Sequence, residues 1–175
     1  MSVETRAELP IGLTWKELRS IKAKIPMPEG WFYREDNFPT TKAFAISRER
    51  VILGVSEFKT GLSLNVILNF RLAQGMNPSE FAKRFIERPP FVIPTGETVV
   101  LHDGPLVSYR RYFKANAKAI RPQQNEPVIF YYEITGNDRT GAAYVMYFET
   151  LEAKWEQDCE TAKLMIENRV FDKSI

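Results

Sequence analysis

The sequence is poor in the side chains from which metal and nucleophilic sites are built. Among 175 residues it has one cysteine, Cys159, and one histidine, His102. One cysteine excludes an intramolecular disulfide and a multi-cysteine metal centre, and one histidine excludes a histidine-rich zinc site. No acidic cluster has the spacing of a calcium-binding loop, and neither a G-x-S-x-G elbow nor a phosphate-binding loop occurs. We therefore expect no metal, no cofactor and no nucleotide site.

Long apolar runs and an excess of one charge sign are missing as well. No apolar run approaches the roughly 18 residues that a membrane-spanning helix needs. The first ten residues, MSVETRAELP, lack the pattern of a secretory leader. The formal net charge is +2, which favours neither a nucleic acid nor an acidic membrane as partner. We expect a soluble cytoplasmic protein, and the alternative is an exported mature domain whose leader has been removed.

The clearest pattern that is present lies near the C-terminus. Residues 142–148 are apolar at every position, so an extended chain has two apolar faces there, as in a central strand covered on both sides. After Thr150 the apolar spacing becomes helical. The predicted apolar stripe comprises Trp155, Cys159, Ala162 and Ile166. We expect a helix that reaches about Arg169 and docks on the sheet through this stripe, with the thiol buried as a small apolar group.

The remaining composition favours a single domain. With 44% hydrophobic residues, a chain of this length is ample for one core and short for two. We expect a flexible arm over residues 1–13 and one domain over residues 14–175. A short helix is predicted between a cap at Thr14 and a stop at Pro26, and a second between a cap at Asn77 and a stop at Pro89.

Strands are predicted where extended apolar patterns lie between turn residues. The candidates are residues 31–34, 42–48, 61–70, 98–102, 106–114 and 128–135, in addition to 142–148. Asn137 and Asp138, flanked by glycines, favour a hairpin turn. Because short turns join consecutive strands, we expect an α+β fold. The expected fold is a three-layer α/β/α sandwich with a largely antiparallel central sheet of about six or seven strands and three helices.

The order of these elements resembles a known family. Four segments carry the likeness: PEGWFYRE, TKAFAISRE, GLSLNV and EAKWEQDCETAKLMIENRVF. Together they resemble the α/β/α sandwich family that includes the photosystem PsbP proteins, the Mog-type Ran-binding proteins of yeast and bacterial DcrB-like lipoproteins, over about residues 28–171. Members are chiefly non-enzymatic accessory, assembly or partner-binding proteins. The resemblance therefore implies a non-catalytic module that binds another protein.

One segment has an uneven charge. Residues 110–121, RRYFKANAKAIR, contain five bases and no acid, with two aromatic residues between the bases. From Glu149 onward, seven acids outnumber four bases. Arginine beside aromatic residues is enriched where interfaces concentrate their binding energy, so we expect this surface to bind an acidic protein. The partner-binding candidates are Arg110, Arg111, Lys114, Lys118 and Arg121. A solvated strand and loop, or a weak nucleic-acid binder, are the alternatives.

Two further sets of residues are candidate sites. A small enzyme using His102 and Asp103 in a cleft is a rival hypothesis, although adjacent residues of a strand point to opposite faces and do not readily share a proton. Trp31 and Tyr33 are candidates for lining a ligand groove, against the simpler interpretation that they are core aromatics. No catalytic residue is assigned.

Overall fold

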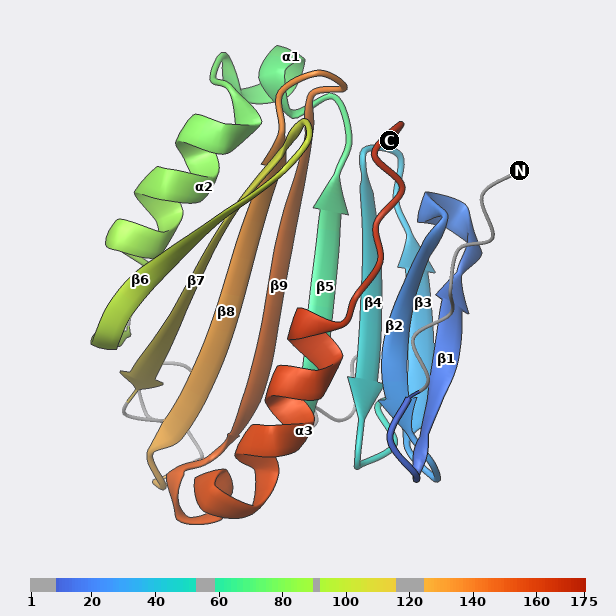
Figure 1. Cartoon of the computed structure of the whole chain (residues 1–175), viewed down its shortest axis with the longest axis vertical. Helices are drawn as coiled ribbons and strands as arrows, with labels where there is room; N and C mark the ends of the chain where they lie inside the picture. The colour runs from blue at the N-terminus through green and yellow to red at the C-terminus, as the bar shows by residue number, and fades with distance from the viewer. Residues whose placement is uncertain (1–8, 53–58, 90–91, 116–124) are drawn as a thin grey trace.

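The centre of the protein is a seven-stranded antiparallel sheet. The computed structural model describes residues 9–52, 59–89, 92–115 and 125–175. The strands follow the order β3-β4-β5-β9-β8-β7-β6, and each neighbouring pair is antiparallel (Figure 1). Their bounds are Phe32–Asn37 for β3, Thr41–Ser47 for β4, Gly61–Ile67 for β5, Ile93–Asp103 for β6, Leu106–Ala115 for β7, Val128–Asn137 for β8 and Ala142–Leu151 for β9.

Three α-helices accompany the sheet within the described residues. They are α1 (Phe70–Gln74), α2 (Pro78–Glu87) and α3 (Trp155–Glu167). Helix α2 packs on β7, β8 and β9 from one side, and α3 packs on the opposite face (Figure 1). The predicted α+β sandwich with a largely antiparallel sheet is confirmed. In the described part of the chain, no helix is both long and apolar enough to cross a bilayer.

Strand β9 separates two apolar cores. Tyr144, Met146 and Phe148 belong to the core beneath α3, whereas Val145 and Tyr147 pack against the core beneath α2. The strand pairs with β5 on one side and β8 on the other. The prediction of a central strand covered on both faces is therefore confirmed. Strand β5 shows the predicted one-sided pattern, since its alternate apolar residues are buried and Ser63 and Asn65 are half-buried.

The first predicted helix is wrong. Residues 13–28 form a hairpin instead, made of β1 (Leu13–Leu18) and β2 (Ala23–Pro28), with a 3-10 turn, η1 (Arg19–Ile21), between them. Its apolar residues, Leu18, Ile21, Ala23 and Ile25, are buried in the same core as α3. Only three apolar residues supported the helix, and the alternation of buried residues in β2 fits a strand. Burial of these side chains in the core that α3 also covers decided the outcome, because it favours the strand over the weak local helical pattern.

The outer layer on that face is therefore mixed. It consists of α3 together with the β1–β2 hairpin, and α1 is the third helix in place of the predicted N-terminal one. The strand bounds also differ from the prediction. Strand β6 begins earlier, at Ile93, and β5 ends earlier, at Ile67, whereas β3 and β9 end later, at Asn37 and Leu151. Residues 1–8 of the predicted arm lie outside the described residues.

Helix α3 docks much as predicted, but its buried face is rotated. Ala162 and Ile166 are fully buried, whereas Trp155 and Cys159 at the other end of the predicted stripe are half-buried. Trp155 packs edge-on against Tyr112, with ring centroids 5.5 Å apart. The helix begins at Trp155 rather than just after Thr150, because β9 continues to Leu151 and a 3-10 turn, η3 (Glu152–Lys154), follows.

Asp158 is the residue that the stripe did not anticipate. Its side chain is buried and accepts hydrogen bonds from Arg48 at 2.5 Å and from the Thr150 hydroxyl at 2.7 Å. The Thr150 hydroxyl also lies 3.1 Å from that of Thr60. Asp158 is not part of the predicted stripe of Trp155, Cys159, Ala162 and Ile166. The structure instead uses it to join the first turn of α3 to residues near the ends of β4 and β9.

The N-terminus of α2 is fixed by the turn between β8 and β9. Asn77 and Pro78 occupy the predicted cap and first-turn positions, but the Asn77 side chain makes no capping hydrogen bond. Asp138 supplies the cap, since it accepts hydrogen bonds from the backbone N–H of Ser79 at 2.8 Å and from its hydroxyl. Gly136 permits this approach: a Cβ there would lie 2.2 Å from the Ser79 nitrogen.

We predict that Gly136→Ala destabilises the protein by about 1–3 kcal/mol, because the added methyl group must displace the backbone of α2 from the sheet. Urea denaturation of the purified chain measures this loss. Ser79→Ala is the matched control, since it removes one part-buried side-chain hydrogen bond, that of Ser79 to Asp138, and leaves the backbone contact unchanged; we expect it to cost about 1 kcal/mol. Equal stability of Gly136→Ala and the unmodified chain would contradict the close contact.

Candidate functional site

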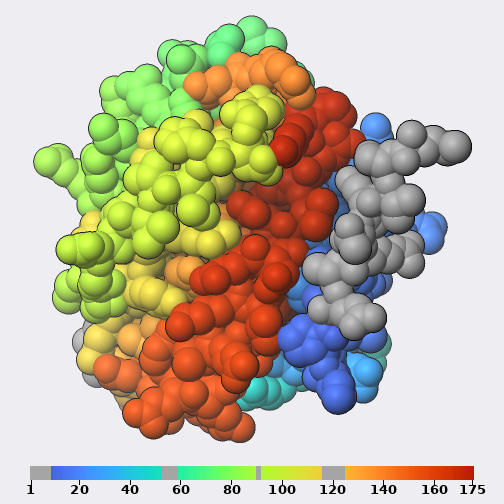
Figure 2. Space-filling model, in the orientation of Figure 1, coloured from blue at the N-terminus to red at the C-terminus, as the bar shows by residue number. Residues whose placement is uncertain are grey.

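A cleft of about 720 Å³ lies beside the C-terminal segment. The hairpin β1–β2 contributes one wall, and the turn between β6 and β7 contributes another. Figure 2 shows the C-terminal segment running over the surface next to the β6 region. The lining residues are Lys22, Lys24, Asp103, Leu106, Arg169, Val170, Phe171, Asp172 and Lys173. We call this site the basic cleft.

Backbone pairing fixes the C-terminal segment against the hairpin. The N–H groups of Lys24 and Val170 each donate to the other residue's carbonyl, both at 2.8 Å. Lys22 adopts the left-handed conformation, with a φ of 47°, as it leads into β2. This conformation is uncommon for a residue with a side chain and is found most often in tight turns and at functional sites. The pairing brings two lysines of the hairpin next to Arg169.

The opposite wall is held by polar contacts to Lys173. Its carbonyl accepts hydrogen bonds from Arg139 at 2.6 Å and from the Asn137 side chain at 3.1 Å. Its ammonium group pairs with Asp103 at the end of β6. The C-terminal segment therefore bridges the hairpin and the β6–β7 turn, and the cleft lies along this bridge.

Cations outnumber anions among the side chains that line the basic cleft, four to two. The two cations without a partner in the lining pair with carboxylates outside it, Lys24 with Glu17 at 3.8 Å and Arg169 with Glu133. Lys22 lies 3.9 Å from Asp172, and both this pair and the pair of Lys173 with Asp103 have partly exposed side chains. Hydrogen bonds from the side chain and backbone of Ser174 lower the pKa of Asp172, so this carboxylate is ionised. Exposed ion pairs contribute little free energy, so an acidic ligand can replace them.

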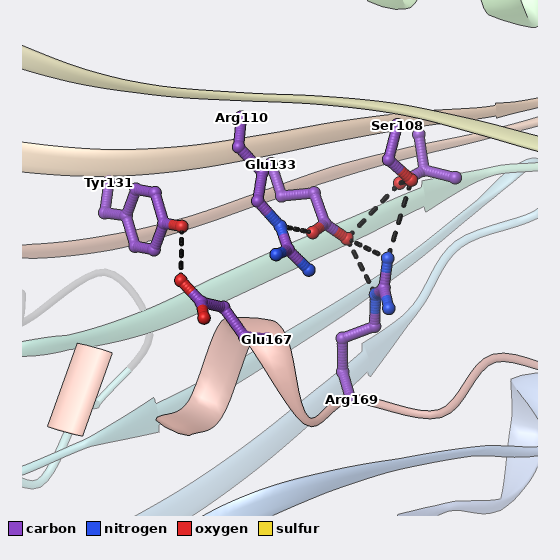
Figure 3. A network of polar contacts seen from close by, with 7 residues as sticks. Ser108, Arg110, Tyr131, Glu133, Glu167 and Arg169 are labelled. Carbon is purple, nitrogen blue, oxygen red and sulfur yellow. Dashed lines mark hydrogen bonds and ion pairs between the residues drawn. The ribbon is translucent and has the colours of Figure 1, made fainter. Parts of the chain in front are cut away.

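A buried ion-pair network lies behind the cleft (Figure 3). Glu133 of β8 is fully buried, and one of its carboxylate oxygens accepts from Nε of Arg110 on β7. The other oxygen lies 2.7 Å and 2.6 Å from Nε and Nη2 of Arg169. Thr135 donates to the same oxygen at 3.4 Å and shares a 2.7 Å hydrogen bond with Ser108.

Strand register explains why these residues meet. Arg110 lies directly opposite Glu133 in the β7–β8 ladder, and Ser108 lies opposite Thr135. Opposite residues of an antiparallel pair share one face of the sheet. That face is covered by α3, and Arg169 follows the end of this helix. The network thus joins the central sheet to the start of the C-terminal segment.

Two tyrosines border the network. Tyr131 donates to the Glu167 carboxylate at 2.7 Å, and its ring stacks on Tyr112 with centroids 4.3 Å apart. Burial, followed by the hydrogen bond to Glu167, raises the pKa of Tyr131 above its ordinary value. The phenol therefore stays protonated and keeps donating, which holds the Glu167 side chain toward Tyr131.

The predicted basic segment does not form one patch among the described residues. Arg110 is largely buried in the network, and Lys114, on the same face of β7, pairs with Glu152 at 2.6 Å. Arg111 points to the opposite face, where its Nε donates to the Gly96 carbonyl at 3.1 Å. Neighbouring strand residues alternate between faces, which separates the two arginines. Lys118 and Arg121 lie outside the described residues.

Trp31 and Tyr33 are not brought together in one groove. Tyr33 lines a cavity of about 450 Å³ with Phe32, Arg34, Ser47, Arg50 and Val51, and Trp31 is not among its lining residues. The Trp31 ring instead stacks on Phe148, with centroids 6.3 Å apart. The Tyr33 hydroxyl donates to Glu35 at 2.8 Å, and Lys16 lies 3.8 Å from its ring centroid.

His102 and Asp103 do not form a pair. His102 is exposed on the edge strand β6 and does not line the basic cleft, whereas Asp103 lines the cleft and binds Lys173. Within the described ranges, no group of three or more histidine, cysteine or acidic side chains is placed to hold a metal ion.

Sequence reasoning missed the residues that organise this site. Glu133 stands alone in the otherwise uncharged strand VIFYYEITG, and a lone acid in a buried strand is a signal that it has a cationic partner. Arg169 was predicted only as the approximate end of the last helix. Lys22 and Lys24 fall within the predicted first helix, which the structure replaces with a hairpin, so their position beside the C-terminal segment did not follow from the sequence.

The structure resembles solved structures of the family that the sequence suggested. Cyanobacterial PsbP (CyanoP) from Synechocystis sp. PCC 6803 matches with a TM-score of 0.54 and 11% identity, over 95% of this chain and 96% of that one. The Saccharomyces cerevisiae Ran-binding protein Mog1p matches with a TM-score of 0.52 and 12% identity, over 93% and 97%. LpqN, involved in cell envelope biogenesis of Mycobacterium tuberculosis, matches with a TM-score of 0.52 and 9% identity, over 90% and 89%.

These likenesses concern the fold. No protein-family model and no curated protein sequence matches the chain. The predicted resemblance to PsbP and Mog-type proteins is confirmed as a shared fold over nearly the whole chain.

We predict that Glu133→Gln destabilises the protein by about 3–5 kcal/mol, because it leaves two largely buried guanidinium groups without their counter-charge. Urea denaturation measures the loss. Glu80→Gln is the matched control: it breaks the exposed pair of Glu80 with Arg84 on α2 and should change stability by less than about 1 kcal/mol. Equal effects of the two substitutions would show that the buried network contributes no more than a surface pair.

Proposed function

We propose that the protein is a non-catalytic binding module that captures an acidic segment of a partner protein in the basic cleft. The observation that carries this proposal is that four cationic and two anionic side chains line a cleft of about 720 Å³, and that the three lysines among them are held only by partly exposed ion pairs. Complementary charge raises the association rate and selects among partners. The rim ion pairs, Lys22 with Asp172 and Lys173 with Asp103, are exposed enough for a partner's carboxylates to exchange with theirs.

The chemistry of the lining supports binding rather than catalysis. Its nine residues include no serine, cysteine or histidine, and its two carboxylates are paired with lysines. Fold likeness adds support of a general kind, since Mog1p is described as a Ran-binding protein. That description supports protein binding for this chain and does not name its partner.

The basic segment, residues 110–121, stays a second proposal for the same function. Its described members outside the network are Arg111 and Lys114, which lie on opposite faces of β7. Each has exposed surface, so either can contribute to an interface at this end of the sheet. The basic cleft is favoured because its charges converge on one volume.

We predict that the double substitution Lys22→Glu/Lys24→Glu weakens capture of the partner roughly tenfold or more, because it reverses two of the four cleft cations. The immobilised chain is incubated with lysate of the source organism, captured proteins are identified by mass spectrometry, and the affinity of the purified partner is then measured. Lys83→Glu/Arg88→Glu, an equal charge change on exposed residues of the α2 side, is the matched control.

A third variant, Arg111→Glu/Lys114→Glu, tests the second surface. Loss of binding only in this variant would move the interface from the basic cleft to β7. Unchanged binding in all three variants would remove both surfaces from the proposal. Thermal melting of each variant, expected within a few degrees of the unmodified chain, separates lost binding from lost folding.

A further inference from the structure

We infer that Arg110 and Arg169 together form an oxyanion-binding site, which receives a carboxylate or phosphate group beside the basic cleft, whose lining includes Arg169. The inference deepens the proposed function, on which it rests for the acidic segment as natural ligand. Its starting point is the charge of the network. Two guanidinium cations share the single carboxylate of Glu133 (Figure 3). The pair therefore keeps one positive charge that Glu133 does not neutralise.

The two arginines also retain free hydrogen-bond donors. A guanidinium carries five N–H groups, and among the described residues Arg110 uses only its Nε, toward Glu133. Arg169 uses Nε and Nη2, toward Glu133 and, at 3.5 Å, toward Ser108. Both terminal nitrogens of Arg110 and the remaining one of Arg169 are thus available. Figure 3 shows the end of Arg110 directed between Glu167 and Arg169.

These spare donors are reachable but poorly hydrated. The side chains of Arg110 and Arg169 are 12% and 16% exposed. Of the described side-chain nitrogen and oxygen atoms that are completely buried, only Thr140 Oγ1 lacks a hydrogen-bond partner, so the spare nitrogens of Arg110 must reach solvent. Hydrogen bonds between an ionised donor and an ionised acceptor are strongest where water is partly excluded. Arg169 itself lines the cleft, which provides the route of entry.

The donors are held in place before any ligand arrives. Glu133 forms ion pairs with both guanidinium groups and so fixes their positions. The Arg169 guanidinium also lies over the Phe171 ring, 5.1 Å from its centroid. Glu167, a second carboxylate drawn in Figure 3, accepts a hydrogen bond from Tyr131 at 2.7 Å. A fixed fork of N–H donors matches the paired oxygens of a carboxylate or phosphate, which a lysine cannot do.

The test uses inorganic phosphate as the probe. Phosphate is titrated into isotope-labelled full chain at constant ionic strength, while NMR follows the arginine Nε–H signals and the backbone amides. We expect saturable shifts of the Arg110 and Arg169 signals that sodium chloride at the same ionic strength does not produce. A second titration with a capped tetraglutamate peptide separates a carboxylate ligand from a phosphate ligand. If neither phosphate nor the peptide produces saturable shifts at Arg110 and Arg169, the inference is overturned.

Arg110→Lys provides the second measurement. It keeps the charge and leaves Glu133 paired with Arg169, but it removes the fork, so we expect the affinity for phosphate or for the peptide to fall about fivefold or more. Arg84→Lys on α2 is the matched control and should change nothing. Equal affinities of both variants and the unmodified chain would also overturn the inference. If Arg110→Lys fails to fold, the titration of the unmodified chain still decides.

The two proposals fail separately. Partner capture that depends on Lys22 and Lys24, without saturable shifts at the arginines, would leave the proposed function standing and remove the oxyanion site. Saturable shifts at the arginines, without any partner whose binding depends on the basic cleft, would leave the oxyanion site standing and remove the proposed function.

Discussion

The constraint on which the structure depends is that strand β9 is apolar on both faces, so each face needs its own cover. Helix α2 covers Val145 and Tyr147 from one side. The opposite side, with Tyr144 and Phe148, is wider than one helix, and α3 shares it with the β1–β2 hairpin (Figure 1). A hairpin at the N-terminus and a helix at the C-terminus thus become neighbours because both bury apolar side chains on the same strands. The order of the layers follows from the two faces of one strand.

The basic cleft follows from the way this mixed layer is closed. The chain leaves α3 beside the hairpin, pairs with it at Lys24 and Val170, and then crosses to the β6–β7 turn. Arg169, the first side chain of this crossing to reach the sheet, meets Glu133 there. The same short segment therefore anchors the layer and gathers cations from the hairpin and the C-terminus. Arg169 therefore has two roles: its ion pair with Glu133 anchors the outer layer to the sheet, and its side chain adds a positive charge to the basic cleft.

How far the sequence predicts this molecule depends on whether a signal is local. The change of period near Thr150 is local, and both β9 and α3 formed as predicted, with a boundary shift of a few residues. The spacing of Trp15, Leu18 and Ile21 is also local, but it fits a helix and a hairpin about equally well, and burial against α3 decided between them. Register is not local at all. That Arg110 faces Glu133 depends on how β7 and β8 align, so a residue interpreted as a surface base is half of a buried ion pair.

The buried network contains two arginines and one glutamate. A buried ion pair seldom stabilises a fold more than well-packed apolar residues of similar volume, because both charges lose their hydration. Stability alone therefore does not explain a carboxylate shared by two arginines, because the second cation adds further desolvation that the single carboxylate of Glu133 offsets only in part. A ligand oxyanion would supply the missing negative charge. The same charge that is costly in the free protein would then favour binding, and the proposed acidic segment would reach it through Arg169, which lines the basic cleft together with three lysines.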